Sequence, residues 1–359
     1  MTVTIKDVAR EAKVSVATVS RALNGQQNVA EAVRRRVQAV AERLRYTPHH
    51  AARSLSSRRT GTIGVVLPEV YGEFFSELMQ GIDQVARMHG LHLLVSSYHG
   101  DPREQGDALR GMRGRVDGLL VMSPYADADG HLAEALAAWP QAVSIGARAP
   151  QGIARVGIDN HAGALAMVRH LVEAGHRRIA FIAGPEDNFD AAERLRGYRE
   201  GLATLLPGAD ADVLPGDFRE ASGARAAQML LARADLPDAV FAANDMMALG
   251  CLSALTAAGR RVPDDIAVAG FDDIPLARYV PPGLTTMRVD IAGLGAAAMR
   301  RLLDAEAPAP GLRVPELVVR ASSGHVRPTP APAPTPASTS ASKAGRRRPR
   351  STASTVAKR

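Results

Sequence analysis

The chain has 359 residues, of which 46% are hydrophobic and only 4% aromatic, and its formal net charge is +7. This length exceeds one ordinary core and predicts two or three domains. A single cysteine, Cys251, excludes an internal disulfide and any metal site built from several cysteines, as expected of a protein in the reducing cytoplasm. The opening residues M-T-V-T-I-K-D have no apolar core, so we expect neither a signal peptide nor a membrane anchor.

The positive charge is concentrated at the two ends of the chain. Residues 1–60 carry 12 Lys and Arg against 4 Asp and Glu, and residues 328–359 carry 7 against none. Residues 61–327 are acidic, with 25 Lys and Arg against 33 Asp and Glu. This distribution is typical of a DNA-binding head on a body that does not itself bind DNA.

Residues 4–24 predict two short helices joined by a turn. Thr4 can cap the first helix together with Asp7, and Ser15 is suited to cap the second. The apolar stripe of the first helix recurs at three- and four-residue spacing: Ile5, Val8, Ala9 and Ala12. The second helix points three side chains inward: Val19, Ala22 and Leu23.

The outer face of the second helix is short, polar and basic. It carries Val16, Ala17, Thr18, Ser20 and Arg21. Such a face beside a helix N-terminus suits a groove of DNA. Spacing alone also permits a small amphipathic hairpin that binds nothing.

A third helix is expected from about Val29 to Leu44, followed by a linker over residues 47–61. Outside its apolar stripe lie Arg34, Arg35 and Arg36. These arginines either form a solvated face or contact phosphate groups.

From Thr62 onward, strands and helices alternate. Continuous apolar runs separated by amphipathic helices indicate parallel strands covered on both faces. The expected strands are 62–67, 92–97, 117–123, 178–184, 239–245 and 266–273, and the expected helices are 74–89, 103–113, 163–174, 191–205 and 246–258. Two series, near 62–158 and 163–287, predict two similar α/β subdomains.

Two groups of motifs resemble the LacI/GalR family of bacterial transcription repressors. V-S-V-A-T-V-S-R-A-L-N-G, followed by V-R-R-R-V-Q-A-V-A-E-R-L-R-Y-T-P, is similar to its DNA-binding domain. Seven ordered pieces, among them F-A-A-N-D-M-M-A-L-G and V-P-D-D-I-A-V-A-G-F-D-D, resemble its effector domain, which has the two-lobed periplasmic-binding-protein fold. The resemblance implies an α/β protein with a small all-α head and parallel sheets in two lobes.

The resemblance also implies the domain boundaries. They are a helix-turn-helix head at 1–46, a hinge at 47–61, an effector-binding and dimerisation domain at 62–326, and a tail at 327–359. The segments 289–305 and 313–321 would return the chain to the first lobe, because the family crosses between lobes three times. The tail is rich in Pro, Ala and Ser, and we expect it to be disordered; its charge serves either weak DNA attraction or solubility.

On the head, the resemblance assigns base reading to Val16, Ala17 and Arg21, with Thr18 and Ser20 nearer the phosphates. Arginine can donate two hydrogen bonds to guanine, whereas the two apolar side chains can only contact groups such as a thymine methyl. In the hinge, Leu55 matches a leucine that wedges into the minor groove. The alternative for Leu55 is a linker residue that rests on the core. The DNA-binding set is completed by Ser15 and Arg34.

In the effector domain, the resemblance assigns hydroxyl recognition to Arg194, Asn244 and Asp272. All three follow strand ends, which face the cleft in a two-lobed protein. The aromatic residues Phe74, Phe75 and Phe218 are candidates for the walls that flank a ring, and each could instead be packed in the core. The tail has no leucine-heptad helix, which favours a homodimer over a tetramer.

The sequence lacks the motifs of common enzymes. G-x-S-x-G, G-x-G-x-x-G and the phosphate-loop pattern are absent, and the ten histidines are scattered, so we expect no metal and no cofactor. Two rivals remain: an exported solute-binding protein, and a sugar-processing enzyme using Asp272 and Asp273. A solute-binding protein would need an export signal and no DNA-reading head.

The sequence therefore predicts a cytoplasmic, dimeric transcriptional repressor of carbohydrate-utilisation genes. Its partners would be a pseudo-palindromic operator in double-stranded DNA and a small-molecule effector, a sugar, in the cleft between the lobes. Induction and corepression both occur in the family, and the sequence does not decide between them.

Overall fold

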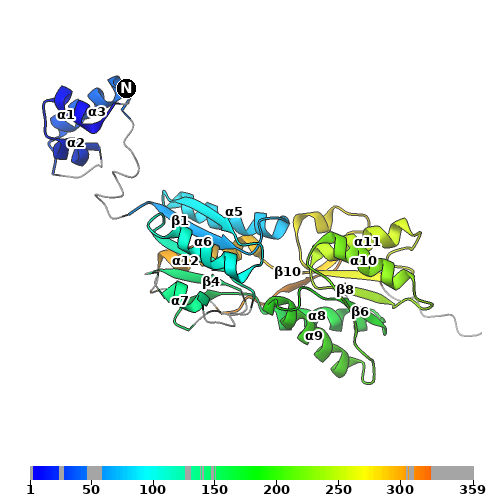
Figure 1. Ribbon diagram of the computed structural model, residues 1–359. Coiled ribbons are helices and arrows are strands. Elements are labelled where there is room, and N and C mark those ends of the chain that lie inside the picture. Colours follow the sequence, from blue (N-terminus) through cyan, green and yellow to red (C-terminus); the bar gives the residue numbers. More distant parts are fainter. Residues whose placement is uncertain are drawn as a thin grey trace, which may run out of the picture. The chain divides into compact units, whose positions relative to one another are not determined.

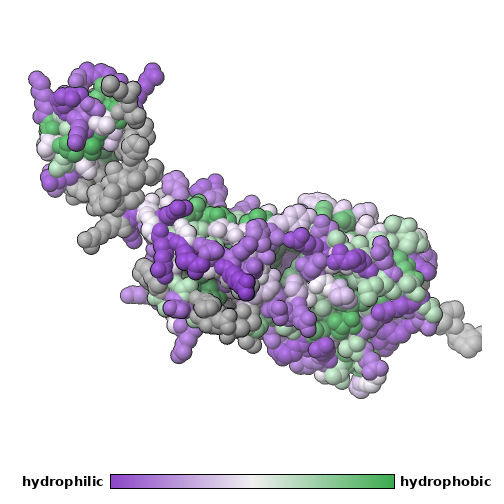
Figure 2. All heavy atoms as spheres, in the orientation of Figure 1, coloured by the Kyte–Doolittle hydropathy of each residue, from purple (hydrophilic) through white to green (hydrophobic). Residues whose placement is uncertain are grey.

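The computed structural model describes residues 3–23, 28–46, 59–125, 131–137, 139, 141–146, 149, 151–304, 306 and 311–324. Up to residue 46 these residues form a helical head, and from residue 59 onward they form two α/β lobes (Figure 1). Hydrophilic side chains cover much of the face shown in Figure 2, with apolar ones between them. Within the described ranges, no helix has both the length and the apolar character needed to cross a membrane.

The head has three short helices around one small core. The carboxylate of Asp7 accepts hydrogen bonds from the Thr4 amide at 3.0 Å and the Thr4 hydroxyl at 2.7 Å, and the Ser15 hydroxyl accepts from the Thr18 amide at 3.1 Å. Both predicted caps are therefore confirmed. The helices are α1 (Ile5–Ala12), α2 (Val16–Leu23) and α3 (Glu31–Arg43). The third begins two residues later than predicted.

The first lobe is a parallel sheet of five strands in the order β2-β1-β3-β4-β5. Alternate residues of one strand supply different cores: Val65 packs with the side chains of α5, whereas Val66 packs with those of α6. Both faces of the sheet are thus covered, as predicted. The strands are β1 (Thr62–Leu67), β2 (His92–Ser97), β3 (Gly118–Met122), β4 (Ala142–Ile145) and β5 (Ala154–Val156), and the helices are α5 (Glu73–Met88), α6 (Pro102–Met112) and α7 (His131–Ala137).

The second lobe has a mixed sheet of six strands in the order β11-β10-β9-β8-β6-β7, in which only β11 is antiparallel. Its strands are β6 (Ile179–Ile182), β7 (Asp212–Leu214), β8 (Ala239–Ala242), β9 (Ala267–Asp272), β10 (Thr285–Arg288) and β11 (Glu316–Val318). Its helices are α8 (Asn160–Glu173), α9 (Phe189–Leu205), α10 (Glu220–Leu231) and α11 (Asp245–Ala257), with a 3₁₀ turn at Pro275–Arg278. The two α/β series predicted from the sequence are confirmed.

The first lobe is completed by a helix from late in the sequence, α12 (Ile291–Leu303), which packs against α5. The two helices approach closely through glycines. A Cβ atom on Gly81 would lie 1.8 Å from the Ala292 carbonyl oxygen, and one on Gly295 would lie 2.2 Å from that of Leu78. The predicted return of 289–305 to the first lobe is confirmed.

The prediction for the segment 313–321 is wrong. Its residues 316–318 form β11, which pairs antiparallel with β10 in the sheet of the second lobe. The physical reason is that β11 satisfies the backbone groups of β10 that face away from β9. Just before it, Arg313 donates its backbone N–H to the Gly157 carbonyl at 2.9 Å, and its own carbonyl accepts from the Asp159 N–H at 2.8 Å. The segment 157–159 and the chain at Arg313 therefore run side by side.

Candidate functional site

The outer face of α2 is open to solvent, as the sequence predicts. Val16 is 41% exposed although it is apolar, and Ala17 and Arg21 are also exposed. Ser15 and Thr18 are held in place, because their hydroxyl oxygens lie 2.9 Å apart and Ser15 also caps the helix. Ser20, like Thr18, is half-buried.

The arginines of α3 differ from one another in exposure. The side chain of Arg34 is only 20% exposed, and its Nε lies 3.6 Å from Oε2 of Glu31. Arg35 is 77% exposed, with Nε 3.1 Å from the other oxygen of the same carboxylate. Arg35 and Arg36 therefore project into solvent more than Arg34, which the sequence places beside them. Leu55 lies outside the described residues.

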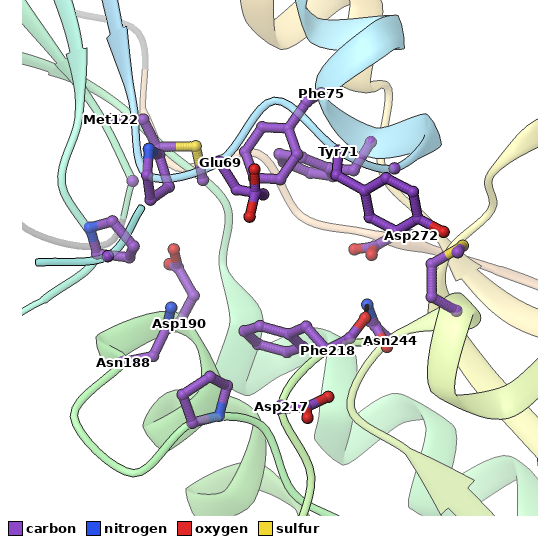
Figure 3. A pocket seen from close by; sticks show the side chains of 18 of the residues that line it. Glu69, Tyr71, Phe75, Met122, Asn188, Asp190, Asp217, Phe218, Asn244 and Asp272 are labelled. Carbon is purple, nitrogen blue, oxygen red and sulfur yellow. Dashed lines mark hydrogen bonds between the residues drawn. The ribbon is translucent and has the colours of Figure 1, made fainter. Parts of the chain in front are cut away.

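A cavity of about 210 Å³ lies between the two lobes. It is many times larger than the roughly 15 Å³ that one water molecule needs, so a small metabolite can enter it. Figure 3 shows Glu69, Tyr71 and Phe75 of the first lobe facing Asp190, Phe218 and Asn244 of the second. The cavity is lined by all six residues that the sequence singles out for effector binding: Phe74, Phe75, Arg194, Phe218, Asn244 and Asp272.

Arg194 is the buried cation of the cavity wall. Its Nε donates to Oδ1 of Asn160 at 2.8 Å, one terminal nitrogen donates to the Ala243 carbonyl oxygen, and the other lies 3.2 Å from Asp272. The guanidinium carbon also lies 3.9 Å from the centroid of the Phe271 ring. With a residue exposure of 5%, Arg194 is fixed by the protein before any ligand arrives.

Asp272 and Asp273 are consecutive residues at the end of β9, but their carboxylates contact different side chains. Both have positive φ, of 119° and 55°, which turns the chain sharply at this point. Asp273 accepts from Arg288 at 2.7 Å and from Arg320 at 2.6 Å, whereas Asp272 faces Arg194 and the cavity. Burial raises the pKa of Asp272 to about 6 against the opposing effect of Arg194.

Asn244 holds the wall of the cavity together at the start of α11. Its Oδ1 accepts from the Met247 amide at 3.0 Å and caps the helix, while its Nδ2 donates to the Phe218 carbonyl oxygen at 2.9 Å. The next residue, Asp245, is fully buried and accepts from the Thr286 hydroxyl at 2.5 Å and the Ile274 amide at 2.9 Å. Burial, and next the charge of Asp272, raise the pKa of Asp245 well above its ordinary value.

The aromatic candidates belong to the cavity and to the core at once. Phe74 and Phe75 form an edge-to-face pair with ring centroids 5.4 Å apart, and both are half-buried. They pack against the main core while also lining the cavity, as Phe218 does from the opposite lobe.

Sequence reasoning missed several further residues that line the cavity: Glu69, Tyr71, Tyr125, Asn188, Asp190 and Asp217. The signal for two of them was available. Asn188 caps α9, accepting from the Ala191 amide at 3.0 Å, and Asp190 follows in the first turn of that helix. The loop after β6 ends in this helix cap, so the first turn of the helix that follows faces the cleft.

Three rim contacts join the two lobes beside the cavity. Tyr71 donates to Glu220 at 2.9 Å, and Arg219 donates to Glu69 at 2.9 Å. The Leu276 amide donates to Glu73 at 2.9 Å. In each contact one partner lies near the start of α5 and the other lies in the second lobe, so opening the cleft at this rim breaks all three.

The histidine, cysteine and acidic side chains of the described ranges form no group of three or more that could hold a metal ion.

Two family models match the chain. Residues 4–49 match the model of bacterial regulatory proteins of the lacI family, and residues 168–323 match that of a periplasmic binding protein-like domain. Among curated proteins, catabolite control protein A of Priestia megaterium is 37% identical over 84% of this chain and 92% of its own. The repressor PurR of Klebsiella pneumoniae (strain 342) is 36% identical over 84% of this chain and 89% of its own.

Solved structures show the same similarity. The Lac repressor dimer bound to operator and the anti-inducer ONPF has a TM-score of 0.82 and 30% identity, covering 90% of this chain and all of that one. The complex of the transcriptional regulator CelR with cellobiose has a TM-score of 0.64 and 35% identity, covering 89% of this chain and 99% of that one.

Proposed function

The chain belongs to the LacI family of bacterial regulatory proteins, and from this membership we propose that it represses carbohydrate-utilisation genes. It is a DNA-binding transcriptional regulator that a small-molecule effector switches, and its relatives are regulators rather than enzymes. The family forms dimers, as in the operator-bound Lac repressor. We place its action in the cytoplasm, where the operator lies.

The head, residues 1–46, would read each half of a pseudo-palindromic operator through α2. Arg21 would donate to guanine, and Val16 and Ala17 would contact apolar groups in the major groove. The exposure of these three side chains supports this assignment, since each is free of the head's own core. Ser15, Thr18, Ser20 and Arg34 would sit nearer the DNA backbone.

The hinge, residues 47–61, would transmit the state of the effector domain, residues 62–326, to the heads. In this proposal Leu55 and its twin in the dimer wedge into the minor groove at the centre of the operator. The basic tail from 327 adds only a weak, salt-dependent attraction to DNA.

One observation carries the switch: the cavity is lined from both lobes. A ligand there contacts both walls, so its binding free energy depends on the angle between the lobes. Similar regulators of known structure bind cellobiose, ribose and ONPF, which favours a sugar here. Arg194, Asn244 and Asp272 would bind its hydroxyls, with Phe74, Phe75 and Phe218 around its ring.

The sugar-processing alternative, which pairs Asp272 with Asp273, is disfavoured because the relatives are regulators and because these two carboxylates do not act on one ligand. A glycosidase needs two carboxyl groups on either side of the scissile bond. Asp273 is held by Arg288 and Arg320, so it does not share the cavity with Asp272. The exported solute-binding alternative does not account for a head that matches a DNA-binding family model.

A fluorescence anisotropy titration tests the proposal. The duplexes are a pseudo-palindrome from the region upstream of its own gene and a scrambled control, at fixed near-physiological salt, with and without a panel of sugars. Tight binding to the palindrome that one sugar shifts several-fold is the expected result. Equal, weak binding to both duplexes, unchanged by every sugar, would contradict it.

A further inference from the structure

The amino ends of the first-lobe strands form an edge that faces away from the effector cavity. The carboxyl ends supply cavity residues such as Pro68, Met122 and Ile145, so the amino ends of these parallel strands lie on the opposite side. The chain enters the lobe here, because β1 begins at Thr62, directly after the hinge (Figure 1). We call this surface the entry edge, and it consists of residues 59–62, 87–92, 113–118 and 300–304.

Contacts between these segments make the entry edge one continuous surface. The His92 amide donates to the Gly61 carbonyl oxygen at 2.9 Å, and the Asp117 amide donates to that of Thr62 at 2.8 Å. The end of α12 joins them, since a Cβ on Gly118 would lie 3.3 Å from the Leu302 side chain. The last residues of the hinge therefore belong to the same surface as the starts of β1, β2 and β3.

The carboxylate of Asp117 fastens the end of the hinge to this edge. Its Oδ1 accepts from the Thr60 amide at 2.6 Å and from the Thr60 hydroxyl at 2.9 Å, and its Oδ2 accepts from the Gly61 amide at 2.8 Å. Both carboxylate oxygens are thus engaged by neutral donors of the hinge. The position of Thr60 is fixed relative to the turn at 113–116, which directly precedes Asp117.

This turn carries two exposed arginines, Arg113 and Arg115, on either side of Gly114. Gly114 has a φ of 71°, which lets the chain reverse between α6 and β3. Among the described residues, neither guanidinium forms an ion pair, in contrast to Arg110 of α6, which pairs with Asp107. Two positive charges therefore face solvent beside the end of the hinge.

The other charges of the entry edge are largely balanced. Arg87 lies 3.0 Å from Asp83 in the same helix. At the end of α12, the two arginines at 300–301 are followed by Asp304 and Glu306. Since the lobes as a whole carry more acidic than basic residues, the unpaired charge of the turn is a local feature of the fold.

The hinge brings this turn within reach of DNA. If Leu55 lies in the minor groove as proposed above, Thr60 follows five residues later and is at most about 18 Å away along a fully extended chain. Thr60 is held in turn by Asp117, two residues after Arg115 and four after Arg113. The long side chains of both arginines can then approach phosphate groups on either side of the operator centre.

We propose that Arg113 and Arg115 form a second DNA contact, in which the entry edge of each first lobe binds phosphates that flank the operator centre. Guanidinium groups suit this role because they donate paired hydrogen bonds to phosphate oxygens. An arginine without an ion-pair partner loses no protein contact when it binds, and each phosphate contact releases a counterion from the DNA. The proposal rests on the repressor function and on the position of Leu55 given under the proposed function.

The test is a fluorescence anisotropy titration of the full chain on its operator duplex at salt concentrations from about 50 to 300 mM. Arg113→Ala combined with Arg115→Ala should lower the affinity at near-physiological salt by at least about tenfold. The slope of log K against log salt should fall by about 0.9 for each contact removed, or about 1.8 per chain. Discrimination against operators with one changed base should stay the same, because phosphate contacts carry no sequence information.

Arg199→Ala combined with Arg260→Ala is the matched control. Both are exposed residues of the second lobe, so this variant changes the net charge equally and leaves the entry edge intact. Its affinity and salt slope should equal those of the original chain. Arg113→Lys combined with Arg115→Lys keeps the charges and should retain most of the slope. Circular dichroism and sedimentation velocity check that every variant is folded and dimeric.

Three results would overturn the proposal. If the alanine variant binds the operator with the affinity and slope of its control, the entry edge does not touch DNA, and an acidic protein surface becomes the partner to test. If its loss is confined to one operator sequence, the arginines read bases instead of phosphates. If the original chain binds the palindrome no better than a scrambled duplex, the repressor function fails as well, whereas the first two results leave it standing.

Discussion

The guanidinium carbon of Arg194 lies 3.9 Å from the centroid of the Phe271 ring, and its Nη2 lies 3.2 Å from Asp272, the next residue in β9. One strand end thus supplies both an aromatic face and a counter-ion for a single buried cation. The arrangement makes Arg194 part of the fold as well as part of the cavity wall.

Replacing Arg194 by methionine should lower the free energy of unfolding by about 3–5 kcal/mol, because Asp272 is left buried without its cation. Urea denaturation followed by circular dichroism measures the change. The control is Arg196→Met on the same helix, whose side chain is 54% exposed and should cost less than about 0.5 kcal/mol. Equal losses in the two variants would show that the burial of the pair is not what matters.

The ionisation of Asp272 should make stability depend on pH. Its folded-state pKa of about 6 lies above the ordinary value of 3.8, so the folded chain binds more protons between these values. The contribution of this group to the free energy of unfolding is therefore fully present below about pH 4. It falls by roughly 3 kcal/mol in total as the pH rises through about 6.

Asp272→Asn, which imitates the protonated group, isolates this effect. The difference in unfolding free energy between the variant and the original chain should shift in favour of the variant by about 2–3 kcal/mol from pH 4 to pH 7. Denaturation curves at four pH values measure it. A difference that stays constant over this range would exclude the raised pKa.

The close approach of α5 and α12 predicts that Gly81→Ala destabilises the first lobe by about 2–3 kcal/mol. The new methyl group would meet the Ala292 backbone, which cannot move without separating the helices. Gly111→Ala in α6 is the control, since its Cβ would meet nothing within 4 Å, and it should be neutral or stabilise by up to about 1 kcal/mol. Thermal unfolding of both variants distinguishes them, and a neutral Gly81→Ala would contradict the packing.

On the head, Arg21→Ala should reduce discrimination between the operator and operators with one changed guanine by about 1–3 kcal/mol. Val16→Ala and Ala17→Gly should reduce it less, because apolar contacts carry less base information. Competition binding against single-base variants of the operator gives the comparison. Equal effects in the three variants would refute the role of Arg21.

Arg35 should behave differently from Arg21. Its exposure favours a phosphate contact, so Arg35→Ala should weaken binding to every duplex alike and reduce the slope of log K against log salt by about 0.9. Arg34, for which the sequence predicts such a contact, is more buried and should respond less in the same salt titration. A loss confined to one operator would rule out the phosphate role of Arg35.

The sequence predicts the elements of this fold well, because their hydrophobic periods are clear. The alternation of β1 and β3 between two cores and the caps at Thr4 and Ser15 follow from local spacing. The placement of residues 316–318 does not follow, because a short apolar strand fits the edge of either sheet. Only the pairing with β10, about 30 residues earlier, decides its lobe.

The cavity is predicted only in part, for the same reason. Strand ends point to Arg194, Asn244 and Asp272, but the rim contacts join residues separated by 149 to 203 positions. Such pairs have no signature in local spacing. The role of Asp273 is likewise settled by Arg320, which the sequence places 47 positions away.

The late position of α12 and β11 has a consequence for the order in which the chain folds as it leaves the ribosome. The three head helices are complete by residue 43, whereas the first lobe waits for residues 291–303 and the second sheet for residues 316–318. A nascent chain therefore acquires its DNA-reading surface long before its ligand cavity. Regulation by an effector can begin only after residue 318 has left the ribosome.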